Sequence, residues 1–260
     1  MKFSWIGAAL FVFLPCIVAR ADEPLETETA RFPAKGTKEL SLLGESQSSS
    51  TGRESIVPLA FEYGMKRNLT LLIEPVLGTK IRPKFGRIGS GVGDTEVTLT
   101  RLIAEERRHR PAFAFAGEVK LPTAKDRLVG TGKTDFAFYA IASKRYSRLD
   151  AHFNLGYTIV GQSVPGVKLK NLTFAALGGD YNLSPKFDLV SEVYGNTSSS
   201  PEAADGNGAG TPITTEVAGS ETVGMLGVRY RADRSSTYFL AFTRDNQKAN
   251  LFRFGITRKL

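Results

Sequence analysis

Ionisable side chains recur at every second position of several apolar segments in this sequence. On an extended strand, alternate residues face the same side, so these side chains share one face and their apolar neighbours the other. Carboxylates and basic groups gathered on one face can pair with one another or contact a polar solute or an ion. The candidates for such a face are Glu62, Glu74, Glu96, Glu118, Lys120, Asp135, Arg145, His152, Glu192, Arg229 and Arg253.

Motifs for catalysis are weaker. Gly132-Lys133-Thr134 resembles the end of a phosphate-binding loop, but the first glycine that the motif requires would fall at Arg127. His152 can in principle pair with a serine, as in an outer-membrane phospholipase, yet the sequence marks no serine or acid as its partner. Metal ligands at a recognisable spacing are absent from the sequence. We therefore predict no enzyme activity, no metal and no cofactor.

The first 21 residues have the pattern of a cleaved secretory signal. Lys2 supplies a positive charge, Trp5 to Leu14 form an apolar core, and Ala19-Arg20-Ala21 matches a cleavage site. The apolar stretch is shorter than the roughly 20 residues that a membrane-spanning helix needs. We predict that residues 1–21 are removed, that residues 22–36 form an N-terminal periplasmic segment, and that residues 37–260 form one domain.

The composition of the mature chain, after cleavage of the signal, limits the kinds of partner that it can bind. The only cysteine, Cys16, is lost, so the mature chain has no disulfide or thiol chemistry. The formal charge falls from +8 to +6, because Lys2 and Arg20 are removed. The remaining basic residues are scattered and lack interleaved stacking aromatics, which argues against nucleic acid. An anionic lipid leaflet is the predicted partner of the basic surplus.

Period-2 alternation dominates the rest of the chain and indicates β-strands. We predict about twelve strands, at about 37–45, 54–64, 69–78, 94–104, 111–121, 134–145, 150–161, 172–183, 187–196, 222–231, 236–244 and 250–260. A soluble β-sandwich also has many alternating strands. However, these strands have roughly ten residues, which suits a tilted crossing of a bilayer better than the shorter strands of a sandwich.

Connections of two lengths alternate along the chain. Five are short, namely Met65–Asn68, Glu105–Arg110, Tyr146–Leu149, Ser184–Lys186 and Ala232–Ser235. Most of the others are longer, the extreme being Thr197–Glu221. Five tyrosines and Phe187 lie near the short turns, as in an interfacial girdle. Together these features predict an all-β, antiparallel, up-and-down barrel in the bacterial outer membrane, with both termini periplasmic.

The apolar positions of each strand give the face that meets lipid. Leu71, Phe113, Phe153, Leu240 and Phe254 are examples. A basic group among them at mid-depth would cost roughly 2–4 kcal/mol, so the ionisable residues must face inward. Two interpretations remain open for these inward charges: they line a pore, or they form a packed network of ion pairs that plugs the barrel.

Four segments between about residues 90 and 160 resemble a known family. They are Gly91-Val92-Gly93-Asp94, Glu118-Val119-Lys120-Leu121-Pro122-Thr123, Gly130-Thr131-Gly132-Lys133-Thr134-Asp135 and His152-Phe153-Asn154-Leu155-Gly156-Tyr157. In that order they resemble the outer-membrane family named for the MetA-pathway of phenol degradation (meta-pathway), whose members are often called transporters. The resemblance implies a channel-type barrel whose relatives sit near genes for aromatic degradation. Leu260 departs from the general barrel pattern, because an aromatic residue is usual there; this bears on insertion by the barrel-assembly machinery, an expected partner.

Two functions follow as hypotheses. The first is a channel for passive passage of small solutes, aromatic or apolar compounds among them. The alternative is a structural barrel with a plugged lumen, whose long external loops serve as a contact surface. The identity of the solute does not follow from the residues.

Overall fold

The computed structural model describes residues 26–161, 169–199 and 220–260 of the chain. The predicted signal peptide and most of the long connection Thr197–Glu221 lie outside these residues. The strands are β1 (Lys38–Ser48), β2 (Gly52–Lys66), β3 (Leu69–Pro83), β4 (Gly89–Gly91), β5 (Thr95–Ala104), β6 (Ala112–Leu121), β7 (Asp135–Tyr146), β8 (Leu149–Ile159), β9 (Leu172–Ser184), β10 (Phe187–Asn196), β11 (Glu221–Arg231), β12 (Ser236–Asp245) and β13 (Asn250–Lys259).

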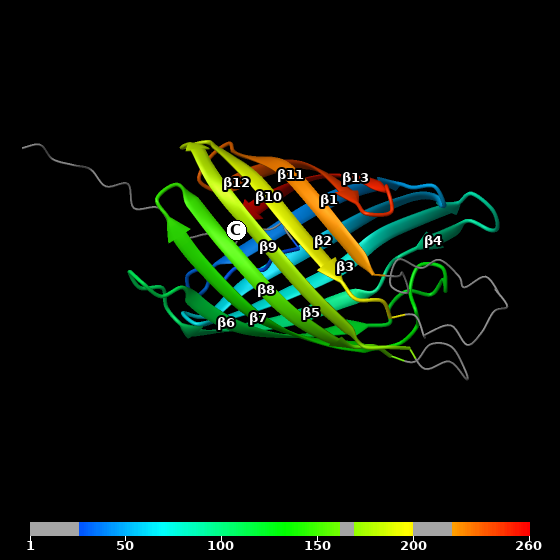
Figure 1. The fold of residues 1–260 in the computed structure, drawn as a ribbon, viewed down its shortest axis with the longest axis horizontal. Helices are drawn as coiled ribbons and strands as arrows, with labels where there is room; N and C mark the ends of the chain where they lie inside the picture. Colours follow the sequence, from blue (N-terminus) through cyan, green and yellow to red (C-terminus); the bar gives the residue numbers. More distant parts are fainter. Residues whose placement is uncertain (1–25, 162–168, 200–219) are drawn as a thin grey trace, which may run out of the picture.

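Twelve of these strands close into a barrel of antiparallel neighbours (Figure 1). The seam is the pairing of β1 with β13, where Leu42 lies opposite Ile256 and Glu45 opposite Arg253. Closure pairs the backbone of both end strands, so that no long sheet edge remains exposed. The predicted up-and-down barrel is therefore confirmed. Within the residues that the structure describes, no helix is long and apolar enough to cross a membrane.

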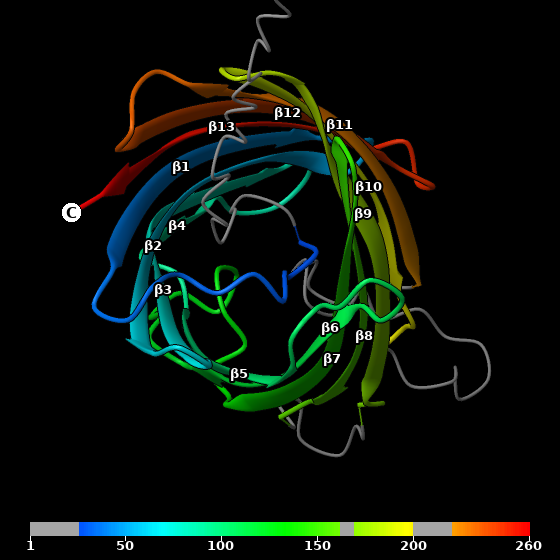
Figure 2. The same ribbon diagram turned by 90° about the vertical axis from the view of Figure 1, so that its left-hand side faces the viewer.

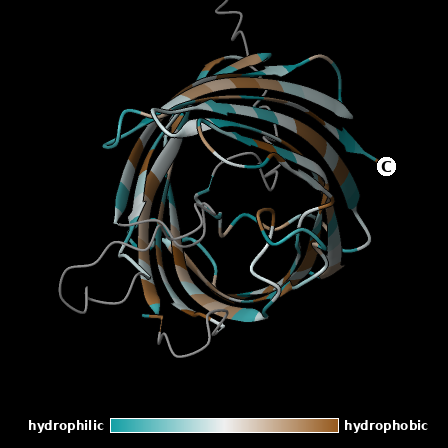
Figure 3. Cartoon of the chain, turned by 90° about the vertical axis from the view of Figure 1, so that its right-hand side faces the viewer, coloured by the Kyte–Doolittle hydropathy of each residue, from teal (hydrophilic) through white to brown (hydrophobic). Residues whose placement is uncertain are grey.

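Apolar and polar residues alternate along the strands (Figure 3), and the exposed large apolar residues lie on the exterior of the barrel. Phe115, Phe153, Leu240 and Phe254 are 47–60% exposed, and the residues next to them in sequence are buried or half-buried. Water would not stabilise such a surface, whereas hydrocarbon does. The predicted lipid face is thus the observed exterior.

The two ends of the barrel differ in their connections. At the turn end, short connections such as Ser147-Arg148 and Pro185-Lys186 join the strands. The loop end carries the connections 84–94, 122–134, 160–171 and 197–220. Two connections at the loop end are also short, 49–51 and 246–249, so length alternates less strictly than the sequence suggests.

Strands β2 and β3 are longer than predicted. They continue to Lys66 and Pro83 and pair over nearly their whole length, with a bulge between Val57 and Pro58. The short strand β4, which was not predicted because its glycines indicate a bend, adds to β3 beyond the barrel wall. This extension raises one side of the wall at the loop end.

Candidate functional site: the barrel lumen

Charged residues from every part of the wall face the interior. Four half-buried carboxylic acids lie on β2, β3, β5 and β6, namely Glu62, Glu74, Glu96 and Glu118. Five further residues are at most 6% exposed, namely Lys120, His152, Glu192, Arg229 and Arg253. Asp135 begins β7 and Arg145 lies near its end. Among these eleven residues, Lys120 and Asp135 form an ion pair. Partners outside the set of eleven are described below for Glu118, Arg145, His152, Glu192, Arg229 and Arg253.

Residues 26–37, which we call the N-terminal strap, lie inside the ring of strands (Figure 2). The backbone amide of Glu28 donates to Asn154 Oδ1 at 2.5 Å, and Asn154 Nδ2 donates back to the carbonyl of Glu28 at 2.9 Å. The amide of Ala30 donates to Ser143 Oγ at 2.8 Å. The segment expected to be a periplasmic extension therefore folds back into the barrel, because inward polar side chains satisfy its backbone groups.

The start of the strap bridges two distant strands. Arg253 of β13 donates to Glu26 Oε1 at 2.6 Å and also pairs with Glu45 of β1 at 2.7 Å. The amide of Glu26 and the hydroxyl of Thr27 donate to the carboxylate of Glu192 on β10. Two of the sequence-predicted residues, Glu192 and Arg253, thus hold the strap.

The strap leaves the lumen through a charged cluster at the turn end. Arg31 pairs with Asp150 at 2.8 Å and with Glu106 at 2.5 Å, and Arg145 pairs with the same Asp150. Burial of Glu106 opposes its ionisation, but hydrogen bonds from Lys144 and Arg31 hold the pKa of this carboxyl below its usual range. The Glu106 carboxylate is therefore ionised at neutral pH and helps to anchor Arg31.

Two glycines of the wall allow the strap to approach closely. A Cβ atom at Gly64 would lie 2.4 Å from the carbonyl oxygen of Ala34, and one at Gly178 would lie 2.8 Å from Thr27 Oγ1. Gly64 also exchanges backbone hydrogen bonds with the strap, accepting from Gly36 at 2.7 Å and donating to Thr37 at 3.0 Å. Side chains at these two positions are incompatible with the observed path of the strap.

Arg229 lies at the centre of a second ion network, on β11. It is 1% exposed, 2.7 Å from Asp180 and 3.7 Å from Asp188. Arg231 also pairs with Asp188, and Asn182 Nδ2 donates to this carboxylate at 2.9 Å. A buried arginine between two carboxylates is retained in a low-dielectric site because its charge is compensated. This part of the wall is a packed network and not a free ring of charges.

His152 has partners that the sequence did not reveal. Its Nδ1 lies 2.8 Å from Ser143 Oγ and its Nε2 lies 3.4 Å from Asp180 Oδ2. The three residue types are those of a hydrolytic triad. However, Ser143 is 1% exposed and its oxygen accepts the hydrogen bond from Ala30, so the strap covers the position that a substrate carbonyl would need. Ser143 therefore serves as an anchor for the strap.

Near the loop end, Lys120 is held between two aspartates. It pairs with Asp135 at 2.6 Å and lies 3.7 Å from Asp94. Its ammonium also donates to Thr131 of the connection 122–134 at 3.3 Å, and Asp94 accepts from the amide of Ala124 at 2.9 Å. Glu118 does not join them, because it accepts hydrogen bonds from Thr98 and Tyr139. The cluster fixes the connection 122–134 at the mouth of the barrel.

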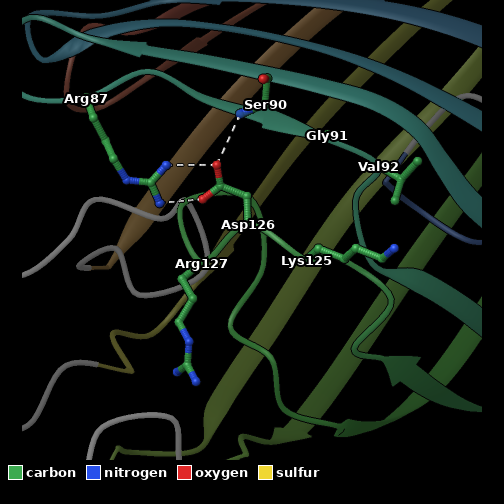
Figure 4. A pocket seen from close by; sticks show the side chains of 7 residues that line it. All are labelled: Arg87, Ser90, Gly91, Val92, Lys125, Asp126 and Arg127. Carbon is green, nitrogen blue, oxygen red and sulfur yellow. Dashed lines mark hydrogen bonds and ion pairs between the residues drawn. The ribbon is translucent and has the colours of Figure 1, made fainter.

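A cleft of about 560 Å³ separates the connections 84–94 and 122–134 (Figure 4). Asp126 crosses it and accepts from both terminal nitrogens of Arg87, at 2.5 and 2.9 Å. The Arg87 guanidinium and the Leu128 amide hold the pKa of the Asp126 carboxyl well below its usual range. Lys125 and Arg127 point away from this pair. The two connections are thereby tied together at one point.

Three aromatic rings form a row on the inner wall. Tyr139, Phe174 and Tyr194 come from β7, β9 and β10, and successive ring centroids are 6.2 Å apart. Tyr139 packs over Gly156 of the strand between β7 and β9, where a Cβ would lie 2.6 Å from the ring. We call these three residues the aromatic row. The aromatic row was not predicted from the sequence, although the alternation of β9 and β10 places Phe174 and Tyr194 on inward positions.

The comparisons concern the fold. The sequence matches no protein-family model and none of the curated proteins, so the resemblance to the phenol-degradation family stays a prediction. An outer membrane channel from Pseudomonas putida F1 superposes with a TM-score of 0.67 over 92% of this chain and 100% of its own, at 13% identity. This chain has the fold of outer-membrane channels. With its apolar exterior, the barrel belongs in the bacterial outer membrane.

Two porins superpose less closely. The NanC porin has a TM-score of 0.58, with 12% identity over 85% of this chain and 100% of its own. The KdgM porin, solved in complex with disordered oligogalacturonate, has a TM-score of 0.54, with 8% identity over 85% of this chain and 98% of its own. At such identities the likeness extends to the barrel and not to the solute.

Proposed function

We propose that this chain is a passive channel for small solutes, with small aromatic compounds among them. The inner wall is the observation that supports it. Small side chains such as Ala60 and Ala137 lie there beside carboxylates such as Glu62 and Glu96, whereas a lumen packed shut by apolar side chains would need large ones. The solute would pass the strap along the wall of β3 to β5, since the hydrogen bonds described for the strap go to other strands, among them Gly64 of β2, and to the turn residue Glu106.

The charges of the lumen favour cations over anions in this proposal. Among the eleven inward residues predicted from the sequence, six are carboxylic acids and four are Lys or Arg, and four of the acids, Glu62, Glu74, Glu96 and Glu118, lie on neighbouring strands of one wall. A wall of carboxylates attracts cations and raises their concentration in a narrow passage.

The aromatic row supports the choice of solute class. Its rings are half-buried and lie on inward positions of β7, β9 and β10, so a flat solute that enters the lumen can stack on them. A cationic aromatic solute would also meet the negative wall, and cation–π attraction adds to stacking. We therefore expect an aromatic ammonium ion to bind better than an aromatic carboxylate.

Conductance of the purified full-length protein in planar bilayers tests the proposal. We expect current steps that benzylammonium reduces more than cyclohexylammonium or benzoate does at equal concentration. The variant Phe174→Ala with Tyr194→Ala should conduct but lose the difference between the two ammonium ions. A matched control, Phe113→Ala with Phe153→Ala, removes two exterior rings and should keep it.

The plugged barrel is the second candidate, and the strap is the observation that favours it. In that case a correctly closed barrel conducts no ions, and weakening the strap by Ser143→Ala with Asn154→Ala leaves it closed. Thr100→Ala with Thr243→Ala, two buried inward threonines, is the control for this variant. A silent wild type that conducts once the strap is weakened would instead show that the strap closes a channel.

A further inference from the structure

A row of basic side chains lies on the exterior of the barrel at the loop end. In the register of neighbouring strands, Arg82 of β3 lies opposite Arg53 of β2, Arg53 opposite Ser48, Ser48 opposite Asn250, and Asn250 opposite Arg244 of β12. One step toward the middle of the barrel, Lys80 lies opposite Ser55. All four basic residues are exposed. We call Arg53, Lys80, Arg82 and Arg244 the basic rim.

The positive charges of the basic rim repel one another when no anion lies between them. Arg53 and Arg82 are direct cross-strand neighbours, and like charges in this position repel each other. The residues between the basic side chains in these two rows are serines, an asparagine and phenylalanines, with no carboxylate among them. A bound anion with several oxygens would remove the repulsion and accept hydrogen bonds from both guanidinium groups.

A groove of about 490 Å³ lies beside Arg53 on this surface. Arg53, Ser48 and Asn250 form its polar part. Phe242 and Phe252, whose ring centroids are 5.1 Å apart and which are 39% and 57% exposed, form its apolar part. The polar part lies nearer the loop end, and the rings begin the apolar belt that faces hydrocarbon. A ligand that fits this order has an anionic head and an apolar tail.

We propose that the basic rim and its groove bind a phosphorylated glycolipid of the outer leaflet. The phosphate groups would lie between Arg53 and Arg82, and an acyl chain would lie on Phe242 and Phe252. The proposal does not depend on transport, but it does rest on the orientation expected from the connection lengths, in which the loop end faces outward. The groove is part of the lipid-facing wall, so the lipid and not a free phosphate ion is its occupant.

Binding of bisphosphorylated lipid A to the full-length protein in neutral detergent tests this proposal. We expect Arg53→Gln with Arg82→Gln to weaken binding about tenfold or more, because two charge-assisted contacts are lost. Arg53→Lys with Arg82→Lys should keep most of the affinity and shows whether charge at these positions is sufficient. The control Arg67→Gln with Arg148→Gln removes two exposed charges at the turn end and should bind as the wild type does.

The nature of the ligand is tested separately. Deacylated lipid A should bind the wild type more weakly than the acylated form, and Phe242→Ser with Phe252→Ser should reduce this difference. Equal binding by the wild type and the Arg53/Arg82 glutamine variant would overturn the proposal, as would an equal loss in the turn-end control. Displacement of lipid A by inorganic phosphate at the same phosphate concentration would show a simple anion site and would also overturn it.

Discussion

The inward lysine of β6 shows how a single residue can be judged from its neighbours. Lys120 is 5% exposed and lies between Asp94 and Asp135. Such a residue is part of a compensated cluster and cannot act as a selectivity filter by itself. Whether an inward charge lines a passage or stabilises the wall therefore depends on its partners more than on its face.

We predict that Lys120→Glu destabilises the barrel. The change leaves three carboxylates together, and removal of one partner of a buried pair typically costs roughly 3–5 kcal/mol. The temperature at which the folded band disappears in detergent gels should fall clearly. Lys133→Glu, an exposed change of the same charge in the connection 122–134, should leave that temperature nearly unchanged. If Lys120→Glu were as stable as the wild type but more cation-selective, Lys120 would line the passage after all.

The second residue-scale prediction concerns Ser143. Because its oxygen accepts from the strap amide of Ala30, Ser143→Ala should free the strap, and trypsin should cleave after Arg31 faster than in the wild type. Ester hydrolysis by the purified protein should be the same for both proteins. Hydrolysis that disappears in Ser143→Ala would instead assign a catalytic role to the Ser143, His152 and Asp180 group.

The strap and the connection 122–134 contain no helix or strand, and both are held by contacts that are polar for the most part. Ala30 and Phe32 add a small apolar contact with Ala112, Ala114 and Ile141. Elements with few apolar contacts can detach at a lower free-energy cost than strands of the closed ladder. We therefore expect the strap and the connection 122–134 to move more readily than the strands.

We predict that Gly64→Ala displaces the strap. The added Cβ would lie 2.4 Å from the carbonyl of Ala34, which is backbone and cannot rotate away. Faster tryptic cleavage after Arg31 should result, and channel conductance should rise if the strap narrows the passage. Gly78→Ala is the matched control, because no atom lies within 4 Å of its added Cβ. An unchanged rate of cleavage in Gly64→Ala would mean that the strap does not follow the described path.

The ion pair between Asp126 and Arg87, which holds the connection 122–134, should persist to a lower pH than the ordinary pKa of an aspartate would allow. Arg87 lowers the pKa of Asp126 in the folded protein. The contribution of this carboxylate to the stability of the connection is therefore complete above its unfolded-state pKa of about 4, and it is lost as the pH falls toward the lower folded-state pKa. Hydrogen exchange of this connection, corrected for intrinsic rates, should therefore be the same at pH 7 and pH 5 and should increase below pH 4. Asp126→Asn should exchange faster already at pH 7. A marked increase in wild-type exchange between pH 7 and pH 5 would contradict this role of the Asp126–Arg87 ion pair.

At the scale of the whole molecule, closure between β1 and β13 determines stability. The ladder has ten paired positions at this seam, from Glu39 with Lys259 to Ser48 with Asn250, and leaves no free edge for detergent to attack. We predict that the unheated protein migrates faster than the boiled protein in detergent gels. Removal of residues 250–260 should abolish this difference, because β12 and β1 can then no longer be joined through β13. Identical migration of the heated and unheated full chain would argue against a closed barrel.

The alternation of the sequence determined the faces of the strands and the number of barrel strands. Side chains two residues apart must share a face, so Phe136 and Phe138 point to lipid and Ala137 to the interior whatever else the chain does. The tertiary structure alone decided which inward residues meet. His152 contacts Ser143 and Asp180, and Arg253 contacts Glu26, because closure and the stagger of the strands bring distant positions to one height in the barrel. The tertiary structure also determined the path of residues 26–37. A short polar segment has no periodicity from which its path could be predicted, and only the assembled wall offers the hydrogen-bond partners that hold it inside the barrel.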